Sequence, residues 1–185
     1  MVAGVEEVLK EFAESVEELL KMPLSEFISK YRDLLPKYSI IHYHANVGTV
    51  FSHLKDEREV MVVVDSEGNV RGILTPTDIV SILRPGGKGV IRMHFGVAYA
   101  VGVKKLPPKS LVKLDVVSVM DKHPLVLEDD MSLSVAIERL SMEKTQYAVV
   151  VNAKGKILGV ISTTSIVKAI AKLSKSIFEL AEHKV

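Results

Sequence analysis

An internal repeat constrains this chain more than any other feature of its sequence. When segments 60–83 and 147–170 are aligned with a shift of 87 residues, eight of 24 positions are identical. Upstream, the apolar residues of 47–54 match those of 133–140, and their 3.6-residue spacing in both copies predicts a helix with one buried face. A repeat constrains the architecture, because each copy is expected to adopt the same fold. We therefore expect two equivalent structural units.

Each copy predicts the element order β-α-β-β-α. Short β-branched, apolar runs indicate buried strands, and a polar stretch ending in Gly68 or Gly155 favours a tight turn between the last two strands. Pro76 is expected at the first position of the second helix, where its missing N–H costs nothing. The expected strands are 40–41, 60–64 and 70–74 in the first copy, and 125–127, 147–151 and 157–161 in the second.

Two segments lie outside the repeat. The N-terminal segment has a helical apolar stripe over residues 5–20, and a similar stripe follows residues 166–180. Such stripes are costly when exposed, so they favour an assembly such as a homodimer. The segment between the copies is expected to form a hairpin or a short helix. The resulting domains are a helical segment at 1–35, a first unit at 36–84, an insert at 85–115 and a second unit at 116–185 with a long C-terminal helix.

Composition excludes several classes of protein. The absence of cysteine rules out disulfides and thiolate metal sites, and a formal net charge of +1 offers no global attraction to nucleic acid. No stretch reaches the roughly 18 apolar residues that a membrane span needs, and the N-terminal residues do not resemble a signal peptide. We expect a soluble, cytoplasmic protein without a nucleic-acid or membrane partner. Few amide residues and no cysteine are typical of a protein from a thermophile.

The repeated motif resembles that of the tandem CBS domain, or Bateman module. In that family a strand leads into a turn of the form Gly-hydrophobic-hydrophobic-Thr/Ser-x-x-Asp, and here this reads Gly72-Ile-Leu-Thr75-Pro-Thr-Asp78. The second copy has the variant Gly159-Val-Ile-Ser162-Thr-Thr-Ser165, and Val119-Met120-Asp121 resembles the family's entry to a second unit. The resemblance implies an α+β fold of two β-α-β-β-α CBS units related by pseudo-twofold symmetry, here with an added N-terminal helical segment.

The resemblance also implies a ligand. Paired CBS units leave clefts in which AMP, ADP, ATP, S-adenosylmethionine or a related adenosyl ligand binds as a regulator, without a required cofactor or metal. A carboxylate such as Asp78 can accept hydrogen bonds from both ribose hydroxyls, and Thr75 at a helix N-terminus can face phosphate. The expected first site comprises Asp78, Thr75, Thr77, Ile40, Ile41, Met61 and Val62, with the adenine against the strand residues. The expected second, weaker site comprises Ser162, Thr164, Ser165, Ala148 and Val149.

Two alternatives to this interpretation stay open. Thr75-x-x-Asp78 is also a capping box, which needs no ligand, although a carboxylate has enough acceptor positions for both roles. Ser165 stands where nucleotide sites of the family commonly have Asp, so we expect the Asp78 site to dominate. The chain as a whole is expected to be a ligand-sensing regulator of a partner protein, or a structural homodimerisation module with vestigial clefts. No usable catalytic constellation is present, so we do not expect an enzyme.

Overall fold

The two copies of the repeat form two equivalent three-stranded sheets. We describe a computed structural model of the chain, which covers residues 2–54, 58–83, 90–94, 97–101 and 112–182. In each sheet the first two strands are parallel and the third is antiparallel to the second, with orders β1-β2-β3 and β6-β7-β8. The strands are β1 (Tyr38–His42), β2 (Val60–Val64), β3 (Val70–Leu74), β6 (Leu125–Glu128), β7 (Tyr147–Val151) and β8 (Ile157–Ser162).

The helices follow the predicted order, which confirms the α+β fold. Pro76 is the first residue of its helix, as expected from its fixed backbone angle. The repeat helices are α3 (Val47–Leu54), α4 (Pro76–Leu83), α6 (Leu133–Met142) and α7 (Thr163–Glu182). The N-terminal elements are α1 (Val2–Lys21), α2 (Leu24–Lys30) and the short 3-10 helix η1 (Arg32–Leu34), and a second such helix, η2 (Val116–Ser118), precedes β6.

The insert between the copies forms a hairpin. Its antiparallel strands are β4 (Val90–His94) and β5 (Val97–Val101). Of the two predicted forms, a hairpin or a short helix, the structure therefore shows the hairpin. The rest of the insert, at residues 85–89, 95–96 and 102–111, lies outside the described residues.

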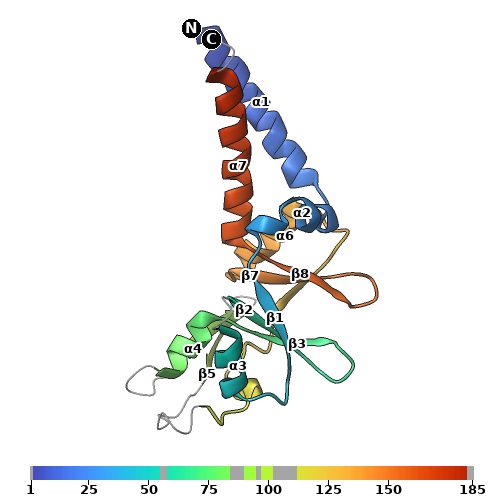
Figure 1. Cartoon of the computed structure of the whole chain (residues 1–185), viewed down its shortest axis with the longest axis vertical. Helices are drawn as coiled ribbons and strands as arrows, with labels where there is room; N and C mark the ends of the chain where they lie inside the picture. The colour runs from blue at the N-terminus through green and yellow to red at the C-terminus, as the bar shows by residue number, and fades with distance from the viewer. Residues whose placement is uncertain (1, 55–57, 84–89, 95–96, 102–111, 183–185) are drawn as a thin grey trace.

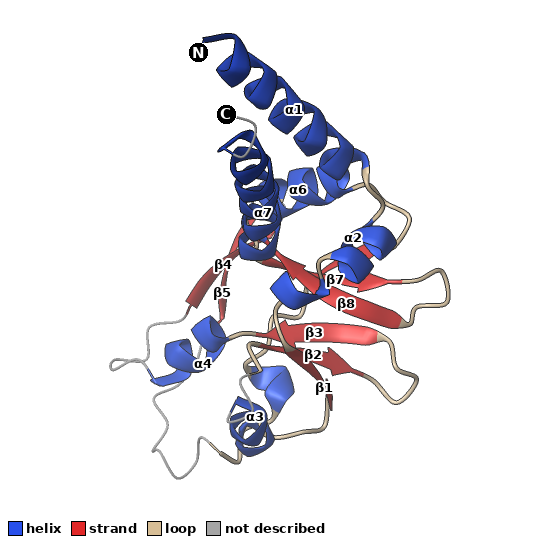
Figure 2. Cartoon of the chain, turned by 45° about the horizontal axis from the view of Figure 1, so that its top comes forward, coloured by secondary structure: helices blue, strands red, loops and turns tan. Residues whose placement is uncertain are grey.

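The two sheets pack against each other through one face each (Figure 2). Val60, Val62 and Ile73 of the first unit form a common apolar cluster with Val149 and Val160 of the second. The opposite face of each sheet is covered by helices, which produces two further cores: α3 and α4 cover the first sheet, and α6, α7 and the N-terminal α1 and α2 cover the second. A strand that is buried on both faces must be apolar at consecutive positions, and this explains the valine runs in both copies.

The segment that precedes the first strand of each unit packs on the other unit. Phe27 of α2 is fully buried in the core of the second unit, whereas Val116 and Met120 are buried in the core of the first. Backbone hydrogen bonds accompany both contacts, for example from Leu24 N–H to the Met131 oxygen at 2.9 Å. The boundaries expected at residues 35 and 116 therefore follow the sequence repeat. The hydrophobic cores do not follow these boundaries, because each core includes residues from the far side of one of them. Each unit thus contributes one segment to the core of the other, as pseudo-twofold symmetry requires.

The amphipathic stripes of the terminal helices face each other. Helix α1 lies along α7, and the two helices together project from the body of the molecule (Figure 1). Leu19 and Ile166 are buried in the core of the second unit, and Ile170 and Leu173 pack against it. The ends of the two stripes nearest the sheets are thus covered within one chain, whereas Leu9 further along α1 is 51% exposed, so the homodimer expected from the stripes stays a prediction. None of the helices formed by the described residues combines the length and apolar character that a bilayer span requires.

Candidate functional site

The turn between β3 and α4 holds a buried carboxylate. Asp78 is 6% exposed, and its Oδ2 atom accepts hydrogen bonds from the Thr75 N–H at 2.8 Å and from the Thr75 hydroxyl at 2.9 Å. The Asp78 N–H donates to the Thr75 backbone oxygen at 3.0 Å. This is half of the expected capping box, because the Thr75 hydroxyl donates to the carboxylate instead of accepting from the backbone. The carboxylate is held at the first turn of α4, where the helix dipole favours negative charge.

The equivalent turn of the second unit is a complete reciprocal cap without charge. Ser162 N–H donates to Ser165 Oγ at 2.9 Å, and Ser165 N–H donates to Ser162 Oγ at 3.0 Å. The Ser165 hydroxyl donates in turn to the Ser162 backbone oxygen at 2.7 Å. Both serines are buried, whereas Thr164 is exposed. The two turns thus have the same backbone form but differ in charge.

Most of the predicted strand residues turn their side chains away from solvent. Ile41 and Met61 are buried in the helix-covered core of the first unit, and Val62 is buried between the two sheets. Ile40 is 51% exposed and is the one member of this set that offers side-chain surface to a ligand. The expectation that adenine lies against all four side chains is therefore corrected, because β2 is covered on both faces.

The strand residues of the second site behave in the same way. Ala148 and Val149 are fully buried, the first in the core of its own unit and the second between the sheets. They can contribute backbone groups but no side-chain surface. Of the first site, Thr77 is exposed and Thr75 is half-buried, so hydroxyl groups are accessible at the N-terminus of α4.

Two cations that sequence reasoning missed lie at the same end of the sheet as Asp78. The register pairs Tyr38 with Val60 and Met61 with Leu74, so β1 and β2 begin where β3 ends. Lys37 directly precedes β1 and Arg58 lies two residues before β2, and Arg58 donates to the Tyr38 backbone oxygen at 3.2 Å. Their position within two residues of the start of a predicted strand is the signal that could have found them.

This end of the first unit lies close to the second unit. Burial raises the pKa of Tyr147, and the carboxylate of Glu59 raises it further. Glu59 itself is held by a hydrogen bond from its N–H to the Lys37 oxygen at 2.8 Å. Tyr38 and Tyr147 both pack against the apolar cluster between the sheets. Residues of both units therefore meet near the start of β1 and β2.

Two further observations concern metal binding and cavities. Among the residues with a described position, no group of three or more His, Asp or Glu side chains could hold a metal ion. A cavity of about 470 Å³ opens at the other end of β3, and none of the predicted site residues lines it.

Comparison with known proteins agrees with this architecture. The model of the family described as CBS domain matches residues 32–85 and 114–172, which together are more than half of the chain. One curated relative, the A-adding tRNA nucleotidyltransferase of Aquifex aeolicus, is 27% identical over 143 residues. That match covers 69% of this chain and 17% of the relative, so the chain spans about a sixth of that protein's length.

Solved structures with the same fold share little sequence identity. The CBS domain of a bacterial CNNM/CorC family Mg²⁺ transporter superposes with a TM-score of 0.61 at 14% identity, covering 88% of this chain and 83% of the other. A CBS domain protein from Pyrobaculum aerophilum, solved in complex with AMP, superposes with a TM-score of 0.55 at 18% identity, covering 82% and 99%. With both copies of the repeat matched by the family model and the same fold in these structures, the chain belongs to the CBS domain family as a tandem pair of units.

Proposed function

We propose that this chain is a regulatory module that binds an adenosyl nucleotide at the Thr75–Asp78 turn. One observation carries the proposal: this turn holds a buried carboxylate, whereas the equivalent turn of the second unit holds the neutral Ser165. A helix cap needs only an acceptor, and the serines of the second unit provide one without charge. The charge of Asp78 is therefore more than the cap requires, and the hydroxyls of a ribose are groups that a carboxylate binds well.

The surroundings of Asp78 supply partners for the rest of a nucleotide. The exposed side chain of Ile40 offers apolar surface to an adenine ring, and backbone groups of β1 can bond its polar edge. Lys37 and Arg58 bring positive charge to the same end of the sheet, where a phosphate group would be favoured. The AMP complex of the Pyrobaculum aerophilum protein supports this class of ligand. A ligand that touched both units would favour one arrangement of them over another, and a partner protein could respond to that change.

Replacing Asp78 should weaken nucleotide binding at least tenfold. A hydrogen bond to a charged group is worth roughly 1.5–3 kcal/mol, which corresponds to about a ten- to hundredfold change in affinity. Isothermal titration with AMP, ATP and S-adenosylmethionine would compare the wild type with Asp78→Asn, which keeps a capping acceptor but removes the charge. The matched control is Ser165→Ala, for which we expect the affinity to change less than threefold.

Melting curves of both variants show whether the fold persists. Equal affinity of the wild type and Asp78→Asn would exclude Asp78 from the site. An equal loss in both variants would contradict the proposed dominance of the first turn.

A structural homodimerisation module is the second candidate, and one observation favours it. Val80 on α4 and Val167 on α7 occupy equivalent positions in the two copies and are 65% and 64% exposed. An apolar contact with a second copy would bury both side chains and so remove apolar surface from water. Sedimentation velocity should then show a dimer for the wild type and a monomer for the double variant Val80→Asp, Val167→Asp. A monomeric wild type would contradict this candidate.

A further inference from the structure

The cavity at the turn end of β3 is separate from the nucleotide site proposed above. It lies between the turn that joins β2 to β3 and the chain that leads from η2 to β6. Arg71 is near the first residue of β3, whereas Thr75 directly follows the last, so the two sites lie at opposite ends of this strand. Its volume of about 470 Å³ is within the range of small-molecule sites.

One wall of the cavity is held firmly by the backbone. The Ile73 N–H donates to the Asp121 oxygen at 3.0 Å, and the Asp121 N–H donates to the Ile73 oxygen at 2.8 Å. Met120, which lines the cavity, is 6% exposed and packs over Gly72. The chain from η2 to β6 is therefore fixed against β3 at this wall of the cavity.

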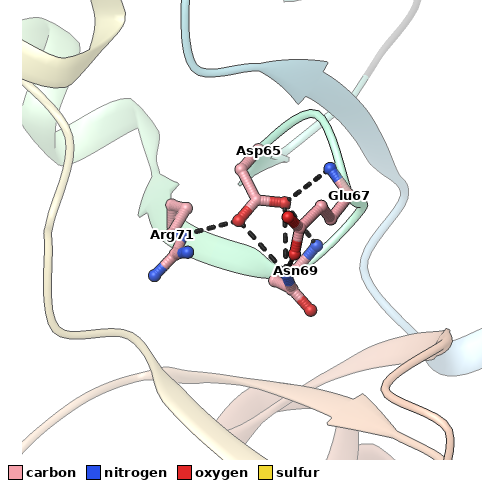
Figure 3. A network of polar contacts seen from close by, with 4 residues as sticks. All are labelled: Asp65, Glu67, Asn69 and Arg71. Carbon is pink, nitrogen blue, oxygen red and sulfur yellow. Dashed lines mark hydrogen bonds and ion pairs between the residues drawn. The ribbon is translucent and has the colours of Figure 1, made fainter.

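A network around Asp65 holds Arg71 in place (Figure 3). Asp65 Oδ1 accepts from the N–H groups of Glu67 and Asn69, both at 2.9 Å, and Oδ2 accepts from Arg71 Nε at 2.7 Å. Partial burial alone would raise the pKa of Asp65, but the hydrogen bonds from Asn69, Arg71 and Glu67 outweigh it and lower the pKa to about 2. Asp65 thus stays ionised and fixes Arg71 through one nitrogen.

Two cationic side chains at the cavity keep donor groups that no described protein anion contacts. Within the described part of the chain, the bond to Asp65 uses only Nε of Arg71, and Lys122 forms no ion pair. Glu67, which also lines the cavity, accepts a hydrogen bond from the Asn69 side chain at 3.2 Å. The Nη groups of Arg71 and the ammonium of Lys122 are therefore available to an anion.

The second unit shows that the turn itself does not need these charges. Asn152, the counterpart of Asp65, accepts from the N–H groups of Lys154 and Lys156, both at 3.0 Å, and so forms the same turn. Leu158 stands where the first unit has Arg71. The ion pair between Asp65 and Arg71 is consequently not needed to form the turn. Its effect is to orient the guanidinium of Arg71 at the cavity.

We propose that this cavity binds a small organic anion, whose carboxylate or phosphate group is held by Arg71 and Lys122. Guanidinium groups suit such oxyanions because their planar donors match two oxygens at once. The side chains of Val117, Met120 and Tyr43 line the same cavity and provide apolar and aromatic surface for the body of the ligand. A single anionic group is favoured over a polyphosphate, because Asp65 and Glu67 repel further negative charge.

The test is a titration followed by ¹H–¹⁵N correlation spectra of the full chain. The probes are benzoate, phenyl phosphate and inorganic phosphate, with benzyl alcohol as an uncharged analogue. We expect saturable shifts of the Arg71 Nε–H signal and of the amides of residues 65–71 with benzoate or phenyl phosphate. Inorganic phosphate should bind at least tenfold more weakly, since it lacks an apolar part. The tighter of the two aromatic probes identifies the head group as carboxylate or phosphate.

Variants connect these shifts to the two cations. Arg71→Leu, which introduces the residue of the second unit, and Lys122→Gln should each weaken binding of the tighter probe at least tenfold. The matched control, Lys156→Gln at the turn of the second unit, should leave the affinity within twofold of the wild type. Unchanged melting temperatures of these variants show that the fold is retained.

The proposal is overturned if no charged probe produces saturable shifts, if benzyl alcohol binds as tightly as benzoate, or if Arg71→Leu binds as the wild type does. None of these results depends on whether AMP binds at Asp78, so this proposal and the proposed function fail independently.

Discussion

Replacing Phe27 with alanine is expected to lower the free energy of unfolding by about 3–5 kcal/mol, the usual cost of emptying a buried aromatic position. Phe27 lies outside both copies of the repeat, yet its side chain is fully buried in the core of the second unit. Its ring also packs on that of Tyr31, with 5.1 Å between the ring centroids. Urea unfolding followed by circular dichroism measures the loss.

Phe12 on α1 provides a matched control, because it is the same residue type but only half-buried. Phe12→Ala should cost clearly less than Phe27→Ala. Hydrogen exchange of the Phe27 variant should increase mainly in β6, β7 and β8, since the lost contacts belong to that unit. A cost below about 1 kcal/mol, or a loss of protection confined to the first unit, would contradict the exchange of segments between units.

Replacing Gly72 with alanine is expected to destabilise the protein by about 2–3 kcal/mol, at the upper part of the range for overpacked cores. An added Cβ would lie 2.7 Å from the Asp121 backbone oxygen and would collide with the sulfur of Met120. The methionine side chain can move, but Asp121 is held by two backbone hydrogen bonds to Ile73. The substitution must therefore push the linking chain away from β3.

Gly159 is the counterpart of Gly72 in the second unit and provides the control. An added Cβ there would meet Ile28 Cδ1 at 3.3 Å, which is the end of a flexible side chain. Gly159→Ala should therefore cost less than about 1 kcal/mol in the same unfolding experiment. Equal costs for the two variants would show that the Asp121 contact does not limit the first position.

The local structure of each unit was predictable because its causes are local. Short runs of valine bounded by turn residues predicted β2 and β7 with their observed ends, and Pro76 marked the first residue of α4. The repeat then extended each assignment to the second copy. The same patterns led to the CBS resemblance, since the Thr75–Asp78 turn is a contiguous motif.

The candidate site was predictable only in part. Asp78 and Thr75 are joined as a contiguous motif predicts, but the exposed state of Ile40 and the burial of Met61 depend on what covers each face of the sheet. Arg58 was missed, because it reaches Tyr38 through the parallel pairing of β1 and β2 rather than through neighbourhood in the chain.

By itself, the sequence determined the two units, their order of strands and helices, and the acidic turn that distinguishes the first unit from the second. Only the tertiary structure decided that α1 packs along α7, that Phe27 is buried in the core of the second unit, and that Arg71 lines a cavity with Lys122. The physical reason is distance along the chain. Periodicity and turn chemistry act over a few residues, whereas burial depends on surfaces that approach each other only after the two sheets have packed.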